Sequence, residues 1–383
     1  MASPVADSYV GPSGGAVAGG RFRVSQFWRD LSPGWTEIPL SGGKPGAGIT
    51  FYSGMALDSD GGKVYLFGGG HSDYSGNDVW EIDLEQRQSM LQHYPPSLGY
   101  QPTVQEVESV IDNVNYPGAI MSGGQPIRPI TRHTYKSVNW IDSIGQFAAG
   151  GGSTYSGPTG QGDYLWQVYP NAPADFWTYA PTSKTWTYKG STLLNAAYGP
   201  FSSIMAYDKV RDRVFCPGTD GNGRITMRAW NPVTNAWTLY AGYASGSEAA
   251  TLSVCIDTLR SRVIVVIKDL STSLAEVWAF VPETVTWEKL TASGAVPSGF
   301  YEQHQVVYSS AGDALLMVRN QESGLSRYDM KTGVWSSEAI PSSVDAFTHV
   351  LGCFVYDHKR KAAILVYGHY YLGPRVFAYK EAA

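Results

Sequence analysis

A unit of about 50 residues recurs six times along this chain of 383 residues, and this repetition limits the folds that the chain can adopt. Each copy opens with an apolar segment, a polar turn and a second apolar segment, the pattern of two short strands joined by a hairpin. The first segment ends in a hydrophobic residue followed by Asp, or by Ser in one copy. These pairs are Leu57-Asp58, Ile141-Asp142, Tyr207-Asp208, Ile256-Asp257, Tyr308-Ser309 and Tyr356-Asp357. The period predicts a repeat architecture rather than several unlike domains.

The second half of the unit adds two more strands. In four copies an aromatic residue marks the third strand, and a tryptophan opens the fourth strand five residues after the turn residue: Pro181 and Trp186, Pro232 and Trp237, Pro282 and Trp287, Met330 and Trp335. The last copy ends before a fourth strand, and residues 34–40, which begin Gly34-Trp35, match the missing strand. The pattern predicts an all-β fold, a single β-propeller with four-stranded blades and a ring closed by this N-terminal strand. We count six blades, with seven as the alternative.

Composition and charge narrow the function classes. Glycine, tyrosine and tryptophan are abundant (43, 25 and 12 residues) and charged residues make up 16%, which fits many short strands and tight turns. The net charge of −5 predicts no nucleic-acid partner. No apolar run approaches the roughly 18 residues of a membrane span, so we expect no membrane insertion. Cys216, Cys255 and Cys353 are scattered without disulfide or metal-ligand spacing, and we expect them to be buried.

The expected domain organisation is one propeller over residues 21–383 behind a flexible arm. Residues 1–20 are rich in Gly, Ala, Ser and Pro, which suits an arm that attaches the propeller to a larger particle. They have neither the basic nor the apolar region of a classical signal peptide. We therefore expect an extracellular or virion-associated protein that needs no signal peptide, with the cytosol as the alternative.

Polar residues gather on one face of the predicted ring. In an up-and-down blade, the first strand begins on the face of the ring at which the second strand ends. The connection from the second to the third strand and the connection to the next blade lie on this same face. The second strands end at His71, Arg319, Asn320 and His369, and the first strands begin at Arg132, His133, Tyr135, His304 and His349. Five of the seven histidines thus share a face, which favours a functional rim over chance, although any one of them could pack between blades.

Two long insertions fall on the same face. Residues 95–131 join the first two blades and include a stretch, 104–114, with the apolar spacing of a short amphipathic helix. Residues 153–175 carry Tyr155, Tyr164 and Trp166. Long loops on a rigid scaffold commonly bind ligands, and aromatic faces beside amide and carboxylate groups suit sugar rings. The alternative is that these aromatic residues hold the insertions against the ring.

A rim of His, Tyr and Arg suits proton abstraction next to a carboxylate. The cation neutralises the carboxylate, one side chain removes the adjacent proton, and another protonates the leaving oxygen. This is β-elimination from a uronate-containing polysaccharide. Hydrolysis usually needs two carboxylates at a defined separation. The rim carboxylates Asp73, Asp220, Asp269 and Glu302 come from different blades, so hydrolysis is the weaker interpretation.

Two resemblances add to this interpretation. The hydrophobic-Asp turns, the Gly-Gly after the second strand and the Trp-opened fourth strand resemble kelch-type repeats of galactose-oxidase-like propellers over residues 34–380. The oxidase's copper site, which needs a cysteine beside a ligand tyrosine, fits poorly with this sequence. The motifs Gly68-Gly-Gly-His71-x-x-Tyr74-x-x-Asn77 and Arg132-His133-x-Tyr135 resemble those of propeller polysaccharide lyases of the ulvan-lyase type and their phage-encoded relatives. Those lyases have seven blades, against the six counted in this chain.

The second resemblance implies roles for individual residues. His71 and His133 would flank the catalytic centre, with Tyr135 as acid or base and an arginine as carboxylate neutraliser. Arg319 is our choice of neutraliser from its position, with Arg132 next. The residues expected to bind substrate are Tyr74, Asn77, Arg132, Tyr155, Tyr164, Trp166, His304, Asn320, His349 and His369.

The sequence thus predicts a lyase or depolymerase that cleaves an acidic polysaccharide by β-elimination, in a phage-associated setting. A carbohydrate- or receptor-binding propeller without catalysis, such as a phage tail tip, is the first alternative, and a protein-interaction propeller is the second. We expect no cofactor and no metal. A Zn²⁺ or Ca²⁺ ion would need ligands from separate blades, and their separations cannot be derived from sequence.

Overall fold

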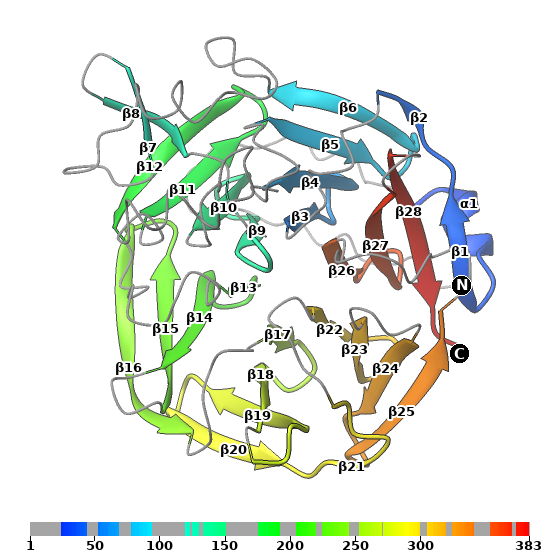
Figure 1. Cartoon of the computed structure of the whole chain (residues 1–383). Helices are drawn as coiled ribbons and strands as arrows, with labels where there is room; N and C mark the ends of the chain where they lie inside the picture. Colours follow the sequence, from blue (N-terminus) through cyan, green and yellow to red (C-terminus); the bar gives the residue numbers. More distant parts are fainter. Residues whose placement is uncertain are drawn as a thin grey trace, which may run out of the picture.

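Six antiparallel sheets stand around a common axis as the blades of a propeller (Figure 1). This computed structural model describes residues 24–43, 53–68, 78–93, 119–122, 125–129, 132, 134–150, 175–191, 204–219, 224–244, 253–269, 271–298, 305–318, 324–340, 353–369 and 373–382. The predicted all-β propeller is confirmed, with six blades. The predicted arm over residues 1–20 and the predicted helix over 104–114 lie outside the described residues.

Blades 1 to 3 follow each other in chain order, and in each the strands run from the axis outwards. Blade 1 contains β3 (Gly54–Asp58), β4 (Lys63–Phe67), β5 (Val79–Asp83) and β6 (Gln88–His93). Blade 2 contains β9 (Val138–Ile141), β10 (Gln146–Gly150), β11 (Asp175–Ala180) and β12 (Thr185–Ser191). Blade 3 contains β13 (Ala206–Asp208), β14 (Arg213–Thr219), β15 (Ile225–Asn231) and β16 (Ala236–Ala244).

Blades 4 to 6 complete the ring. Blade 4 contains β17 (Ser253–Asp257), β18 (Arg262–Lys268), β19 (Ala275–Val281) and β20 (Thr286–Leu290). Blade 5 contains β22 (Gln305–Ser309), β23 (Ala314–Val318), β24 (Gly324–Asp329) and β25 (Val334–Ala339). Blade 6 contains β26 (Cys353–Asp357), β27 (Ala362–His369), β28 (Gly373–Lys380) and β1 (Gly34–Ile38). The two-residue strands β2 (Ser41–Gly42) and β21 (Ser293–Gly294) add parallel edges to β6 and β25.

The N-terminal segment closes the ring as predicted. Strand β1 pairs antiparallel with β28, from Gly34 opposite Lys380 to Ile38 opposite Val376. A short helix that the sequence pattern did not predict, α1 (Gln26–Asp30), precedes it. The buried Trp28 of α1 donates its indole N–H to the Leu84 carbonyl of blade 1 at 2.9 Å. The helix therefore fastens blade 6 to blade 1.

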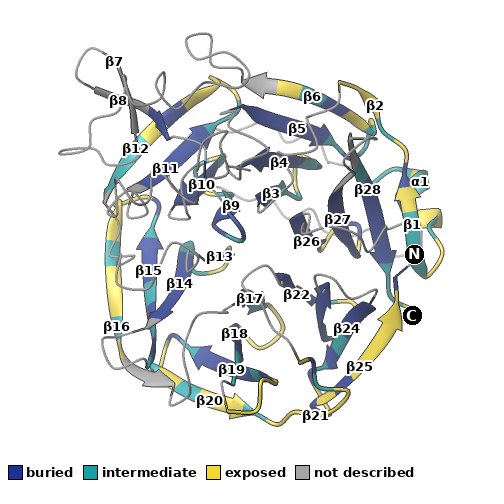
Figure 2. Ribbon diagram, viewed as in Figure 1, coloured by how far each residue is buried: buried dark blue, intermediate teal, exposed yellow. Residues whose placement is uncertain are grey.

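The hydrophobic core is divided among the six boundaries between neighbouring blades (Figure 2). Alternate residues of a strand face opposite neighbours. In β18, Val263 and Val265 pack toward blade 3, whereas Ile264 and Val266 pack toward blade 5. Each sheet is thus covered on both faces, which explains why the second strand of a blade is apolar at almost every position.

The repeated Asp stabilises the hairpin turn between the first two strands. The carboxylate of Asp357 accepts hydrogen bonds from the backbone N–H groups of Lys359 (2.9 Å) and Arg360 (3.1 Å). Asp208 and Asp257 accept the corresponding bonds in blades 3 and 4. A short carboxylate side chain satisfies turn N–H groups without help from elsewhere, so each of these three hairpins carries its own stabilising contact.

The copy with Ser in place of Asp obtains its carboxylate from another part of the chain. Glu381, which follows β28, contacts the hydroxyl of Ser309 and forms an ion pair with Arg327, with 3.0 Å between the carboxylate and Nε. Gly312 makes room for it, because a Cβ at this position would collide with the Glu381 carboxylate. The segment after β28 therefore completes the turn of blade 5.

Polar side chains link the innermost strands around the axis. Gln305 of blade 5 is the central member: its amide donates to the carbonyl of Tyr135 in blade 2 (3.2 Å) and accepts from the N–H of Phe354 in blade 6 (2.8 Å). Blades 2 and 5 are opposite each other in the ring (Figure 1), so the Gln305 side chain connects segments from opposite sides of the axis. Ser253 and Asn139 make similar links between neighbouring blades.

The first prediction concerns Gln305. Gln305→Ala should lower the free energy of unfolding by about 3 kcal/mol, because it leaves the buried N–H of Phe354 and the carbonyl of Tyr135 without this partner. Urea denaturation followed by tryptophan fluorescence measures the change. Gln86→Ala, at an exposed turn, is the matched control and should change stability by less than about 0.5 kcal/mol. Equal effects of the two substitutions would contradict the central role of Gln305.

The second prediction concerns Glu381. Glu381→Ala should cost about 1–2 kcal/mol of unfolding free energy, because Ser309 and Arg327 lose a charged partner. Adding Ser309→Asp should recover part of this loss, because the turn then carries its own carboxylate. The measurement is again urea denaturation. No loss in the single variant, or no recovery in the double variant, would contradict the assigned role.

Candidate functional site

The candidate site lies on the face of the ring that carries the beginnings of the first strands and the ends of the second strands; we call this the site face. Of the predicted site residues, the structure describes Arg132, Tyr135 and the backbone of His369 at the end of β27. The others lie outside the described residues: His71, Tyr74, Asn77, His133, Tyr155, Tyr164, Trp166, His304, Arg319, Asn320 and His349. Arg132 and Tyr135 come shortly before β9 rather than within it.

The two motifs singled out in the sequence meet at the boundary of blades 1 and 2. Gly68, which opens the glycine-rich motif, has φ 137° and lies so close to the second motif that a Cβ on it would be 3.2 Å from the Arg132 carbonyl. The hydroxyl of Thr134 donates to the Phe67 carbonyl at 2.8 Å and accepts from the N–H of Gly54 at 2.7 Å. These contacts fix the start of the His71 loop against the segment that carries His133.

Tyr135 has a strained and enclosed backbone. Its φ is 41°, an uncommon value for an aromatic residue, and it lies in a turn closed by the N–H of Ser137 donating to the Thr134 carbonyl at 2.6 Å. Other non-glycine residues with positive φ, such as Asn235 and Ser261, end hairpin turns. Gln305 donates to the Tyr135 carbonyl, and a Cβ on Gly54 would collide with that carbonyl. The surroundings therefore hold Tyr135 in this conformation.

The side chains of Arg132 and Tyr135 are both enclosed. Arg132 is 1% exposed and Tyr135 is 3% exposed. Neither side chain is open to a polymer in this conformation, so their burial favours a positioning role over direct contact with a substrate. The depth of these side chains depends on packing between blades, which the sequence pattern does not give.

Blade 5 approaches the same region across the axis. Gln305, the first residue of β22, pairs with Val318, the last residue of β23. Since Gln305 also donates to Tyr135, the end of β23 at Val318 lies beside the residue that makes this contact. In the sequence, Gln305 is a polar residue at the start of an otherwise apolar inner strand. This was the signal that could have indicated its contact with Tyr135.

The insertion between blades 1 and 2 includes an unanticipated hairpin. Strands β7 (Ala119–Ser122) and β8 (Gln125–Pro129) pair within residues 95–131, and β8 lies beside β12 of blade 2 (Figure 1). Arg128 in β8 is 4% exposed, and burial lowers its pKa to about 10. The hairpin thus brings another buried arginine to blade 2.

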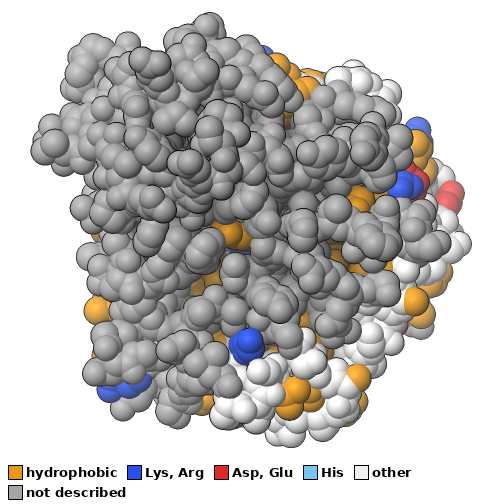
Figure 3. Space-filling model, in the orientation of Figure 1, with side chains coloured by type: hydrophobic (Ala, Val, Ile, Leu, Met, Phe, Trp, Pro, Cys, Tyr) orange, Lys and Arg blue, Asp and Glu red, His pale blue; other side chains and the backbone are white. Residues whose placement is uncertain are grey.

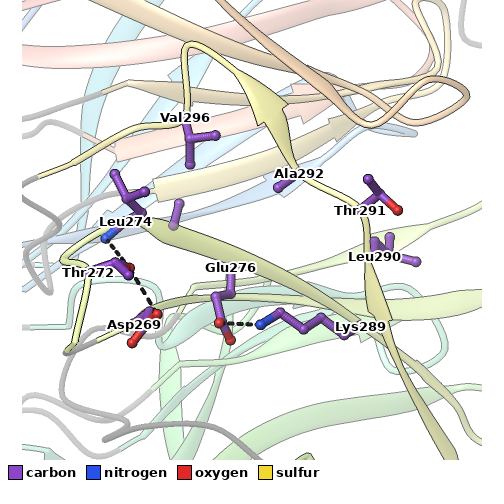
Figure 4. A pocket seen from close by; sticks show the side chains of 10 residues that line it. Asp269, Thr272, Leu274, Glu276, Lys289, Leu290, Thr291, Ala292 and Val296 are labelled. Atoms are coloured by element: carbon purple, nitrogen blue, oxygen red, sulfur yellow. Dashed lines mark hydrogen bonds and ion pairs between the residues drawn. The ribbon is translucent and has the colours of Figure 1, made fainter.

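A pocket of about 400 Å³ opens on blade 4 (Figure 4). Glu276 and Lys289 form an ion pair in its wall, and the indole N–H of Trp278 donates to Glu276 at 3.1 Å. Asp269 accepts hydrogen bonds from the N–H of Ser271 (2.8 Å) and the hydroxyl of Thr272 (2.9 Å). Because its own turn occupies this carboxylate, Asp269 is a poor candidate for acid-base chemistry.

The cysteines are buried and free, as expected. Burial raises the pKa of Cys255 to about 12 and raises those of Cys216 and Cys353 as well, so all three thiols stay protonated at neutral pH.

Within the described ranges, no group of three or more His, Cys, Asp or Glu residues is placed to hold a metal ion. In the same part of the chain, no helix has the length and apolar character needed to cross a membrane. The described side chains visible in Figure 3 are mostly apolar or uncharged.

Comparisons with known proteins support the fold alone. No protein-family model and no curated protein matches the chain. Among solved structures, a protein of unknown function from Bacteroides thetaiotaomicron is similar with a TM-score of 0.50 and 12% identity, over 91% of this chain and 76% of that one. A luciferin-regenerating enzyme (TM-score 0.48, 8% identity, 92% and 96% coverage) and the protein YjhT (0.45, 12%, 87% and 95%) are also similar.

The third prediction tests the contact between the two motifs. Gly68→Ala should cost about 2 kcal/mol or more of unfolding free energy, because a Cβ there would meet Thr134 and would lie 2.8 Å from the hydroxyl of Ser53 at a positive φ. Gly218→Ala, near the end of the equivalent strand of blade 3, is the matched control, since a Cβ there meets nothing within 4 Å. Thermal and urea denaturation of both variants measure the difference. Similar stabilities would mean that the motifs do not pack as described.

Proposed function

We propose that the site face binds an acidic, uronate-containing polysaccharide and cleaves it by β-elimination at the boundary of blades 1 and 2. The observation that carries the proposal is the packing of Gly68 against the Arg132–Thr134 segment. It brings the segments that contain His71 and His133 to the same end of two adjacent blades. The kelch-type assignment and the ulvan-lyase resemblance belong to this proposal, and the hydrogen-bonded hydrophobic-Asp turns support the former.

The reaction would proceed as a proton transfer coupled to loss of the glycosidic oxygen. One histidine removes the proton from the carbon next to the carboxylate. The electron pair of that C–H bond forms a carbon-carbon double bond, the neighbouring carbon-oxygen bond breaks, and the second histidine protonates the leaving oxygen. The products are an unsaturated uronate and a free hydroxyl.

Arg319 is the proposed cation for the substrate carboxylate. Arg319 follows Val318 in the chain, Val318 pairs with Gln305, and Gln305 contacts Tyr135. A side chain from this end of blade 5 would therefore be near the boundary of blades 1 and 2. A cation there would lower the pKa of the carbon acid by stabilising the enolate that develops. Tyr135 and Arg132 are enclosed, so in this proposal they position the histidine segments.

The enclosure of Tyr135 and Arg132 also favours a second candidate function, a propeller that binds the polysaccharide without cleaving it. In either case the protein would act outside the cell or on a virion, because such polysaccharides are found there. Residues 1–20 would attach it to a larger particle. Aromatic side chains of the insertion 153–175 would stack on sugar rings.

The fourth prediction separates these two functions. Incubation with a panel of uronate polysaccharides should give a rising ultraviolet absorbance from the new double bond, and His71→Ala or His133→Ala should reduce the rate at least about 100-fold. His358→Ala is the matched control, because His358 is exposed in a hairpin turn on the opposite face. Its rate should equal that of the unchanged protein.

Other outcomes of the same experiment are informative. A flat trace with every substrate, together with retention of the protein by a polysaccharide in affinity electrophoresis, would establish the binding function and reject the lyase. New reducing ends without ultraviolet absorbance would indicate hydrolysis. Neither cleavage nor retention across the panel would reject both proposals.

A further inference from the structure

Two cations near hairpin turns that the structure describes are paired with carboxylates. Arg360, 2% exposed, forms ion pairs with Asp357 of its own turn and with Glu85 of blade 1, the latter at 2.6 Å. In blade 1, Lys63 pairs with the buried Glu81 at 2.5 Å. Such pairing is expected because a charge removed from water without a partner is strongly unfavourable.

Lys136 departs from this pattern. It lies two residues before β9, bridges to Ile204 of the neighbouring blade, and accepts a hydrogen bond from the N–H of Met205 at its carbonyl (3.0 Å). The residue as a whole is partly exposed, but its Nζ is buried and has no hydrogen-bond partner within the part of the chain that the structure describes. The hydroxyl of the adjacent Ser137, a residue with 0% exposure, also lacks one among the described residues.

The described titratable group that is coupled electrostatically to Lys136 is the thiol of Cys255, in β17 of blade 4, which would act on the amine only when ionised. Desolvation lowers the pKa of Lys136 to about 8, and burial raises the pKa of Cys255 to about 12. At pH 7 the amine is therefore mostly the ammonium ion and the thiol is neutral. Among the described residues, no negatively charged group is found to act on the Lys136 amine.

We propose that Lys136 binds a small monovalent anion, chloride under ordinary conditions, where the inner ends of blades 2 and 3 meet. Because the Nζ is buried, the carboxylate of a polymer could not reach it. A single-atom anion that has lost its water shell could balance the charge of the amine and would need less space than a larger anion. Lys136 lies just before β9 of blade 2 and bridges to Ile204, which lies just before β13 of blade 3. A bound anion would therefore lie where these two blades meet. This site is separate from the proposed reaction and does not depend on it.

The pH dependence follows from the ionisation of Lys136. Without the anion, the folded protein releases this proton near pH 8, whereas the unfolded chain holds it until near pH 10.5. The unfolded state then binds more protons in this interval, so stability rises with pH between these values. An anion that binds the ammonium form adds stability at pH 7, and its contribution fades as the pH rises and Lys136 loses its proton.

The fifth prediction compares chloride with gluconate, an anion too large for such a site, at equal ionic strength. At pH 7 chloride should raise the melting temperature of the full chain by about 2 °C or more over gluconate. Lys136→Met should abolish this difference, and in gluconate it should be at least as stable as the unchanged protein. The chloride effect should shrink as the pH rises to 10.

Crystals grown in bromide provide a direct measurement on the unchanged protein. An anomalous peak within hydrogen-bonding distance of the Lys136 Nζ is expected. A peak elsewhere would be an adventitious ion only and would overturn the proposal. Equal responses to chloride and gluconate, or a chloride response that persists in Lys136→Met, would also overturn it. If Lys136→Met does not fold, Lys136→Gln and the bromide peak decide the question.

Discussion

Burial of both faces of every blade is the constraint on which this structure depends. A sheet that is apolar on both faces is stable only between two neighbours, and an open row of such sheets would expose one face at each end. The six boundary clusters show that closing the ring removes both exposed faces. Strand β1 and helix α1 complete that closure, so contacts made by residues 26–38 protect apolar surface that belongs to blades 1 and 6.

Apolar packing alone would leave the blades free to slide along one another, and the polar side chains near the axis restrict this movement. Thr134, Asn139 and Ser253 each bond to the backbone of a neighbouring inner strand. Gln305 crosses to the opposite blade and contacts the backbone of Tyr135. The proposed site is next to these contacts, and polar bonds between blades would give its residues the exact placement that the proposed reaction needs.

The fold could be predicted from sequence because its signals are local and repeated. An Asp that accepts from its own turn, as Asp357 does, is visible in a few residues. Glu381 could not be assigned to the turn of Ser309, because 72 residues separate them and only the closed ring brings them together. For the site, strand direction was enough to place the segments of Gly68 and Arg132 on one face. The burial of Arg132 and Tyr135 depends on how neighbouring blades pack, which a linear pattern does not contain.

The pairing of β1 with β28 has a mechanical consequence. Gly34 is opposite Lys380, so the N-terminal end of β1 and the C-terminal end of β28 lie at the same end of the ladder. A force that pulls those two ends apart would break the hydrogen bonds of the ladder one pair after another, instead of loading all of them at once in shear. Helix α1 precedes the ladder, and Trp28 and the contact of Lys380 with its carbonyl anchor that helix. A pull from the N-terminal side would therefore meet this anchor first, and the propeller would stay closed until the anchor yields.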